Sequence, residues 1–454
     1  MCKKLKAFFA LLIAIAPAVR AQTGLTGAIN TLLTPQIKND EPGGVVLVAK
    51  NGQVIYKKPF GMADMELGVP VNDSMIFYIG SNTKQFTAIA ILQLVEQGKI
   101  QLQDTIGKFI DSCPYPASSI TIQQLLSHTS GLGSNYETAS ATLRNQAGAT
   151  PAGLAKYVAQ LPMDFSPGTK WDYNNANFYV LGWLVEKLSG KSYAGYVTEN
   201  IFARAGMYNT YMQKELSIIK NRPHGYKNDK TGDIQPVNNI NTGTTTYAAG
   251  GIQSTAADLL KWNRALLAGK IVKPATLTAA FTPQKLLNGE PVKYGLGWHL
   301  EELHGSPTVR HGGLVPGFTA ETLYLPKEDV FVIILLNAGI SKIPIIALSR
   351  IIAGLAIGKP YIFNEVAFDK SILKNFVGVY TNTHKEQINI TEDNGQLCFQ
   401  RPGGHLYVLH YAGNNEFFMD KDFLRVQFTT GAAGSIKSLQ LSKVDIGMTE
   451  WFKD

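Results

Sequence analysis

The segment Ser81-Asn82-Thr83-Lys84 places a hydroxyl and an amine three positions apart, at the start of an apolar run with helical spacing. On a helix, positions i and i+3 lie on one face, which puts the lysine one turn from the serine hydroxyl. A buried lysine loses proton affinity by desolvation and can then take the serine proton. The spacing therefore suits acyl transfer through a covalent ester on Ser81.

The Ser-x-x-Lys pattern alone is weak evidence, because it recurs at residues 217–220 and 371–374. Ser81 differs from these in its setting, since it opens an amphipathic helix predicted over residues 83–97. Its hydroxyl and backbone N–H would sit at a helix N-terminus, where a developing negative charge is stabilised. We therefore predict that Ser81 is a nucleophile and that Lys84 assists it.

Tyr173-Asn174-Asn175 is a second candidate group, placed after Pro167-Gly168 and before a predicted helix. A plain structural interpretation is a tyrosine packed over a loop with an asparagine cap, and the Tyr-x-Asn pattern recurs at residues 226–228 and 380–382. If Ser81 is the nucleophile, Tyr173 is expected to act as an acid or base beside it. Asn175 is then expected to hold Lys84 and the amide of the substrate.

His311-Gly312-Gly313 follows a short strand-like segment. Two glycines after the histidine let a substrate approach the backbone closely, because no side chain blocks it. His311 is predicted to anchor a substrate carboxylate or to tune the tyrosine hydroxyl, with Gly313 at the binding site. The N–H of Leu314 is predicted to form an oxyanion hole together with that of Ser81.

A rival sequence, Lys230-Thr231-Gly232, lies in the polar stretch at residues 228–233 and is predicted to be a hairpin turn. The eight histidines form no HxH or HExxH pattern and no Cys/His cluster, so no metal site is predicted. No glycine-rich phosphate loop is found either, so no cofactor is predicted. Cys113 and Cys398 are expected to be unpaired thiols.

The N-terminus has the pattern of a secretory signal peptide. Lys3, Lys4 and Lys6 precede an apolar run at residues 7–16 that is too short to span a bilayer, and small residues at Val19 and Ala21 fit a cleavage site after residue 21. An uncleaved membrane anchor is the alternative. Cleavage would place the protein in the periplasm or outside the cell, with no membrane span after the leader is removed.

The formal charge of +8 comes from 42 Lys and Arg against 34 Asp and Glu. Residues 1–21 carry four of the basic residues and no acidic one, which leaves 38 against 34, or +4. The remaining basic residues form no run of five or more and no aromatic-interleaved stripe, so nucleic acid is not an expected partner. The sequence does not fix an oligomeric state.

Strand-like segments at residues 44–50 and 53–60 flank Asn51-Gly52, which predicts a hairpin. Helices are predicted at three places before residue 270 and strands at three places after residue 293; the helix ranges are 83–97, 177–189 and 255–268, and the strand ranges are 294–300, 318–325 and 330–336. A helix at 344–357 ends the domain. This order predicts one α+β domain at residues 22–360, whose sheet pairs the hairpin with the late strands. Residues 361–454 are predicted to form a small all-β barrel or sandwich.

Six motifs along the chain resemble those of the serine β-lactamase-related family of class C β-lactamase type, whose relatives include D-amino-acid peptidases and carboxylesterases. In chain order they are Tyr78-Ile79-Gly80-Ser81-Asn82-Thr83-Lys84, Leu125-Leu126-Ser127-His128-Thr129-Ser130-Gly131-Leu132, Tyr173-Asn174-Asn175, Gly250-Gly251-Ile252 with Ser254-Thr255 and Asp258-Leu259, Tyr294-Gly295-Leu296-Gly297-Trp298, and His311-Gly312-Gly313. The resemblance covers residues 25–357 and implies a β-lactamase/penicillin-binding transpeptidase-like fold, with an antiparallel sheet flanked by helices. The C-terminal part resembles a lipocalin-like appendage.

The resemblance implies a covalent acyl-enzyme, with attack by Ser81, proton transfer by Lys84 and Tyr173, and release by water. His128 is not carried over as a catalytic residue and is predicted to support a loop. Dedicated β-lactamases of this type have Lys-Thr-Gly where this chain has His311-Gly312-Gly313, and Lys230 comes too early in the family order to replace it.

The predicted function is an exported serine hydrolase acting on a small peptide or ester. The alternatives are a genuine class C-like β-lactamase and a penicillin-binding sensor or binding module with little turnover. A hydrolase degraded to a scaffold for the C-terminal part is a further alternative, which the intact motif side chains disfavour.

Overall fold

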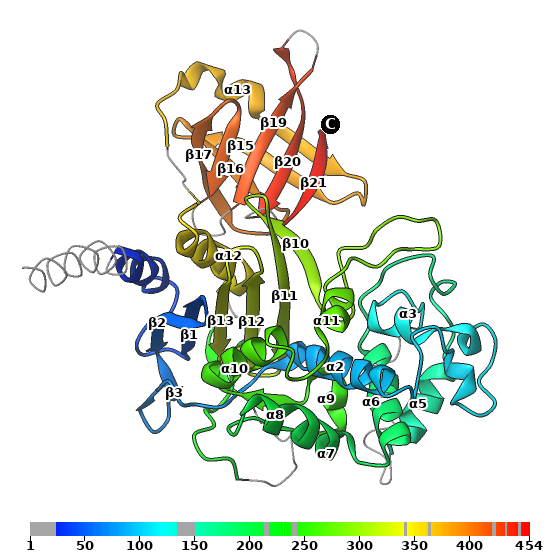
Figure 1. The fold of residues 1–454 in the computed structure, drawn as a ribbon. Coiled ribbons are helices and arrows are strands. Elements are labelled where there is room, and N and C mark those ends of the chain that lie inside the picture. The colour runs from blue at the N-terminus through cyan, green and yellow to red at the C-terminus, as the bar shows by residue number, and fades with distance from the viewer. Residues whose placement is uncertain are drawn as a thin grey trace, which may run out of the picture. The chain divides into compact units, whose positions relative to one another are not determined.

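The computed structural model describes residues 24–133, 150–212, 218–229, 231–237, 243–339, 343–361, 365–419, 424–431, 434–443 and 446–454. The predicted signal peptide and Lys230 lie outside these ranges. The chain divides into two units, one ending at Ile345 and one spanning Ile346–Asp454, and each has its own hydrophobic core (Figure 1). Within the described ranges, no helix combines the length and the apolar character that crossing a bilayer requires.

A six-stranded antiparallel sheet forms the centre of the first unit, in the order β10-β11-β12-β13-β1-β2. The predicted pairing of the N-terminal hairpin with the late strands is confirmed, because Gly44 of β1 lies opposite Leu336 of β13. Asn51 and Gly52 both have positive φ, at 51° and 74°, as a two-residue hairpin turn requires. The strands are β1 Gly44–Lys50, β2 Gln53–Phe60, β10 His299–Leu303, β11 Ser306–Val315, β12 Phe318–Leu325 and β13 Val330–Leu336.

One predicted strand is wrong over most of its length, because the chain is extended only from His299 and not from Tyr294. Gly295 N–H donates to the Trp298 carbonyl at 2.8 Å, and Gly297 has φ of 98°, so the glycines make a turn here. A Cβ on Gly297 would lie 2.7 Å from the Ala88 Cβ. The turn therefore packs directly against the helix that carries Lys84.

This helix, α2 (Thr83–Glu96), runs from the sheet toward α6 (Asn175–Ser189), which it contacts (Figure 1). The predicted one-sided burial is wrong: twelve of its fourteen residues are buried, as expected for a helix enclosed by other elements. Other helices among the described residues of this unit include residues 24–33, α3 Ile122–Leu126, α5 Pro151–Gln160, α7 Tyr193–Val197, α8 Ala203–Ala205, α9 Gly243–Gly250, α10 Ala256–Leu267 and α11 Pro274–Ala280.

Three small sheets are found among the described residues of the first unit. One of them consists of β5 (Phe77–Tyr78), β9 (Ile252–Ser254) and β6 (Tyr211–Met212). Its strand β5 comes shortly before Ser81 in the chain. The second is a hairpin of β7 (Tyr226–Asn228) and β8 (Ile234–Pro236), whose turn contains Thr231 and Gly232. The hairpin turn predicted there is confirmed for these described residues. The third pairs β3 Met62–Asp64 with β4 Val69–Pro70.

The second unit contains a closed barrel of eight antiparallel strands, with β14 and β21 closing it through the Tyr380 and Lys453 pair. This resolves the predicted choice between a barrel and a sandwich. Buried apolar side chains form its core, including Leu373 and Phe376 of α13 (Leu373–Phe376). The helix α12 (Ile345–Ala356) is present as predicted. The strands are β14 Gly378–Asn382, β15 Gln387–Asp393, β16 Gln396–Gln400, β17 Leu406–Gly413, β18 Glu416–Met419, β19 Leu424–Thr430, β20 Ile436–Lys443 and β21 Ile446–Lys453.

Candidate active site

Ser81 lies in a single 3-10 turn, Gly80–Asn82, that leads directly into α2. Gly80 has φ of 51°, and a Cβ there would lie 2.6 Å from the backbone nitrogen of Leu314. Only glycine fits this position, because it accepts a positive φ and leaves room for the neighbouring backbone. The tight turn places Ser81 at the N-terminus of α2, as predicted.

Lys84 is fully buried one turn after Ser81. Its ammonium Nζ donates to Ser81 Oγ at 2.9 Å, to Asn175 Oδ1 at 2.7 Å and to the Ala249 carbonyl at 2.8 Å. An ammonium group has three protons to donate, so these partners can hold it in a fixed direction. The structure therefore joins Ser81 and Lys84 to Asn175, which lies 91 positions after Lys84 in the sequence.

Asn175 owes its position to the cap of α6. The side chain of Asn174 accepts a hydrogen bond from the Ala176 N–H at 2.9 Å, which begins the helix at Asn175. The Asn174 amide also donates to the Leu132 carbonyl at 2.6 Å, which ties this helix start to a second loop. The first side chain of α6 is thereby directed toward Lys84.

Tyr173 lies beside the same ammonium, with Lys84 Nζ 4.9 Å from the centre of its ring. Its hydroxyl is buried, and no partner among the described residues lies in hydrogen-bond geometry with it. Burial raises the pKa of this hydroxyl well above its usual value, and the nearby Ser81 hydroxyl offsets only part of the rise. Tyr173 is therefore protonated at neutral pH.

His311 is buried on β11 with both ring nitrogens engaged. Nδ1 lies 2.6 Å from the Gly312 carbonyl, which can only accept, so Nδ1 carries the proton. Nε2 then accepts a hydrogen bond from the Tyr294 hydroxyl at 3.0 Å. Burial, with the charges of His299 and Lys84, lowers the pKa of His311 well below its usual value. The imidazole is neutral in this structure, and its nitrogens face protein groups.

Gly313 lies against the turn that holds Ser81. A Cβ on Gly313 would lie 1.9 Å from the Ile79 carbonyl oxygen and 3.0 Å from the Ser81 backbone nitrogen. The following residue, Leu314, pairs with Thr319 of β12, and its side chain is half exposed. The two backbone nitrogens predicted to form an oxyanion hole therefore belong to segments in close contact.

His299 is a site residue that no sequence motif predicts, and its ring lies nearly parallel to the Tyr173 ring, at 13° and 6.2 Å between centres. Burial and the charge of Arg310 lower the pKa of His299 to about 4. Tyr294 was singled out only as part of a motif, yet its hydroxyl bonds to His311. No sequence pattern marks His299, because strand pairing from a distant part of the chain brings it to this place.

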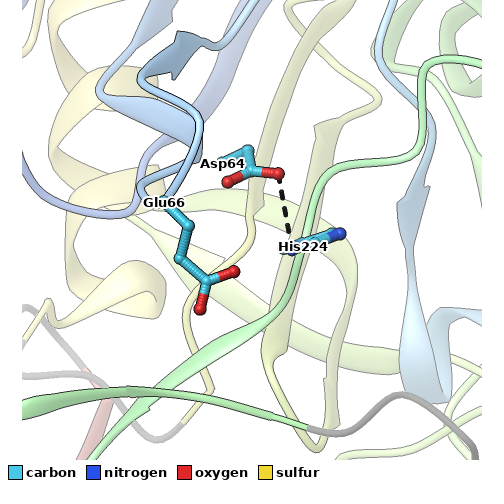
Figure 2. Close-up of side chains that lie close together, drawn as sticks. All are labelled: Asp64, Glu66 and His224. Carbon is cyan, nitrogen blue, oxygen red and sulfur yellow. Dashed lines mark ion pairs between the residues drawn. The ribbon is translucent and has the colours of Figure 1, made fainter.

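Outside this site, Asp64, Glu66 and His224 bring three possible metal-binding atoms within 4.8 Å of one another (Figure 2). Asp64 already uses one carboxylate oxygen to accept from the Leu67 N–H, and the other faces His224 Nδ1 at 3.5 Å. Glu66 and His224 are exposed. The contacts are those of an ordinary surface ion pair.

Known proteins and protein families match this chain along nearly its whole length. Residues 27–344 match the Beta-lactamase family, and residues 364–454 match a domain of unknown function, DUF3471. Penicillin-binding protein 4* of Bacillus subtilis (strain 168) is 27% identical over an alignment of 428 residues, which covers 89% of this chain and 93% of that protein.

Solved structures agree with this match. The octameric penicillin-binding protein homologue from Pyrococcus abyssi superposes with a TM-score of 0.66 at 25% identity, over 94% of this chain and 99% of that chain. A D-stereospecific amidohydrolase from Streptomyces sp. gives a TM-score of 0.58 at 25% identity, over 71% of this chain and 94% of that chain. With the motifs carried by this fold, these matches show that the chain belongs to the beta-lactamase family.

Proposed function

We propose that this protein is an exported serine hydrolase that cleaves an amide or ester through a covalent acyl-enzyme on Ser81. The observation that carries the proposal is the buried Lys84 ammonium, which bonds to both Ser81 Oγ and Asn175 Oδ1. Burial disfavours the charged form of a lysine, and the neutral amine that remains after loss of one proton can act as the base for the adjacent serine. Similarity to a D-stereospecific amidohydrolase supports amide substrates.

In the first half of the reaction, the Ser81 oxygen bonds to the substrate carbonyl carbon while its proton passes to Lys84 in the neutral form. The carbonyl oxygen becomes an oxyanion, which the N–H groups of Ser81 and Leu314 stabilise. Collapse of this intermediate breaks the bond to the leaving group. Tyr173 is protonated because burial raises its pKa, so it is suited to donate the proton that the leaving group needs.

In the second half, a water molecule attacks the acyl carbon, its proton passes to the same pair of residues, and the acid product leaves while Ser81 regains its proton. Asn175 holds Lys84 in position and offers its amide to the substrate. We assign the neutral His311 the role of binding the Tyr294 hydroxyl beside Tyr173. It is not assigned to a substrate carboxylate, because its nitrogens already face Tyr294 and Gly312.

The proposal also includes export of the protein and a role for each of its domains. Residues 1–21 are assigned as a cleaved signal peptide that delivers the protein to the periplasm or the medium. Residues 22–360 are assigned as the hydrolase, and residues 361–454 as the separate β-rich domain. N-terminal sequencing of protein from the periplasm and the medium is expected to begin at residue 22, and a cytosolic, full-length product contradicts this assignment.

A penicillin-binding protein with little turnover is the second candidate, favoured by the 27% identity to penicillin-binding protein 4*. The two candidates differ in product release. Steady release of product in excess of enzyme supports the hydrolase, whereas one equivalent of stable acyl-enzyme supports the binding protein. Nitrocefin, p-nitrophenyl esters, and D- and L-aminoacyl amides form a suitable substrate panel.

Labelling with a fluorophosphonate and with a fluorescent penicillin tests the nucleophile. Wild-type protein is expected to label at Ser81, and Ser81→Ala is expected to lose the label. Ser371→Ala is the matched control, since Ser371 has the same Ser-x-x-Lys pattern but its hydroxyl donates to Asp369 at 2.7 Å in the second unit. Equal labelling of wild type and Ser81→Ala contradicts the proposal.

A further inference from the structure

His128 holds the backbone on both sides of Tyr173. The His128 carbonyl accepts a hydrogen bond from the Asp172 N–H at 3.0 Å, and its imidazole Nδ1 accepts one from the Asn174 N–H at 3.1 Å. The imidazole also packs on the phenol ring, with the ring centres 4.3 Å apart. One residue thus contacts the preceding residue, the following residue and the ring of Tyr173.

The backbone of His128 is itself unusual. It follows α3 with φ of 59°, a left-handed conformation that costs energy for any residue other than glycine and that asparagine tolerates better than most. This conformation lets the carbonyl and the side chain of one residue reach the same loop. His128 is fully buried, so the bonds it makes are sheltered from water.

The partners of Nδ1 fix the protonation state of the imidazole. Asn177 Nδ2 lies 3.0 Å from Nδ1, and Asn177 Oδ1 accepts from the Ser130 hydroxyl at 2.6 Å, which identifies the group facing the imidazole as the amide nitrogen. Two donors, the Asn174 N–H and this amide, therefore point at one ring nitrogen. Nδ1 must carry a lone pair, and the single proton of the neutral ring is on Nε2.

The Tyr173 hydroxyl makes no well-formed hydrogen bond with the described residues, although the Ser81 hydroxyl lies close enough to lower its pKa. Its location relative to Ser81 is therefore set by the backbone at residues 172–174 and by the packing of its ring. We propose that His128, in its neutral Nε2–H form, is a positioning residue that places the Tyr173 hydroxyl for proton transfer. The proposal rests on the proposed function, and it assigns His128 a role in the rate of acylation beyond loop support.

Two variants at this position separate the hydrogen bond from the backbone conformation. His128→Asn keeps an acceptor oxygen near the Nδ1 position and tolerates the left-handed φ. His128→Gly also accepts this φ but has no acceptor. A misplacement of about 1 Å at a reacting group can cost about 100-fold in rate. We expect the acylation rate constant to fall at least about 10-fold in His128→Gly and clearly less in His128→Asn.

The rate is measured with an aminoacyl amide, whose leaving group needs the Tyr173 proton, and is normalised to active sites titrated with the fluorophosphonate, so that unfolded protein does not count. His304→Gly is the matched control, because His304 also has a positive φ, 49°, in the turn between β10 and β11. It should leave the rate unchanged. Equal rates per active site in His128→Gly and wild type overturn the proposal. Absence of any labelling or turnover in wild type instead contradicts the proposed function.

A measurement on the wild-type chain tests the protonation state of His128 directly. Protein labelled with ¹⁵N-histidine gives long-range ¹H–¹⁵N spectra that distinguish the two neutral tautomers and the cation. The His128 signals, identified by their loss in His128→Asn, are expected to report the Nε2–H tautomer at pH 7. An Nδ1–H tautomer or an imidazolium at that pH overturns the proposal.

Discussion

Replacing Gly313 with alanine is expected to damage the reaction far more than its size suggests. The new methyl group would lie 1.9 Å from the Ile79 carbonyl oxygen, whereas a carbon and an oxygen in contact need about 3.3 Å. Because the obstacle is backbone on both sides, β11 and the turn at Ser81 must separate by about 1 Å or more. That movement carries the Leu314 N–H away from the Ser81 N–H.

The magnitude follows from what an oxyanion hole contributes. Loss of one donor costs about 100- to 1,000-fold in rate, or about 3–4 kcal/mol of transition-state stabilisation. Overpacking of this kind also lowers the free energy of unfolding by about 1–3 kcal/mol. Gly313→Ala is therefore expected to fold with a lower Tm and to acylate about 100-fold or more slowly.

The assay is the rate of acylation by a p-nitrophenyl ester, per titrated active site, beside thermal unfolding. Gly312→Ala is the matched control: its Cβ would meet Glu321 Oε2 at 2.8 Å, on the far end of a side chain, and the Ala320 carbonyl oxygen only at 4.0 Å. We expect this neighbour to lose at most a few-fold in rate. If Gly313→Ala acylates within a few-fold of wild type while folded, the oxyanion-hole assignment of Leu314 is wrong.

Three further predictions concern the same site. Tyr173→Phe is expected to leave Tm unchanged, because no hydrogen-bond partner of the lost hydroxyl is found among the described residues. The same variant should slow amide hydrolysis about 100-fold or more and p-nitrophenyl ester hydrolysis much less, since nitrophenolate leaves without a proton. Equal losses on both substrates contradict the assigned role. Burial lowers the pKa values of His128, His299 and His311, so at acidic pH the unfolded chain binds protons that the folded chain does not. The free energy of unfolding should therefore fall as the pH drops below about 6.5, by up to about 1.4 kcal/mol per pH unit for each histidine. For His299 this window ends near its folded pKa of about 4, and urea unfolding of His299→Gln between pH 7 and 5 should show a slope smaller by about one proton. Gly182→Ala should destabilise the fold by about 1–3 kcal/mol, because its Cβ would lie 2.3 Å from the Ala248 Cβ and would displace the segment whose Ala249 carbonyl holds Lys84. Gly27→Ala, whose Cβ would have no neighbour within 4 Å, should leave the stability unchanged. Equal Tm values for these two variants refute the packing argument.

Local rules account for the elements that the sequence predicted well. Asn51-Gly52 specifies its hairpin because both residues accept a positive φ, and Gly98 and Gly190 end their helices for the same reason, with φ of 70° each. The strand at Val330–Leu336 follows from a continuous apolar run. In each case the signal and the structure lie within a few residues of one another.

The predictions that failed depended on distant packing. The segment from Tyr294 has the composition of a strand, but its glycines turn because α2 passes within 2.7 Å of the position of a Gly297 Cβ. The spacing of α2 suggests one buried face, yet its other faces are covered by elements from elsewhere in the chain. Periodicity describes one element at a time and cannot register how many neighbours that element has.

The sequence by itself determined the residue types of the chemistry, because a hydroxyl, an amine and a phenol in family order are visible as letters. The tertiary structure alone decided what each of them faces. Lys84 receives partners at positions 81, 175 and 249, and three histidines surround Tyr173 as neutral rings because burial removes the water that would charge them. Protonation states and hydrogen-bond directions are properties of an enclosed space, and only folding creates that space.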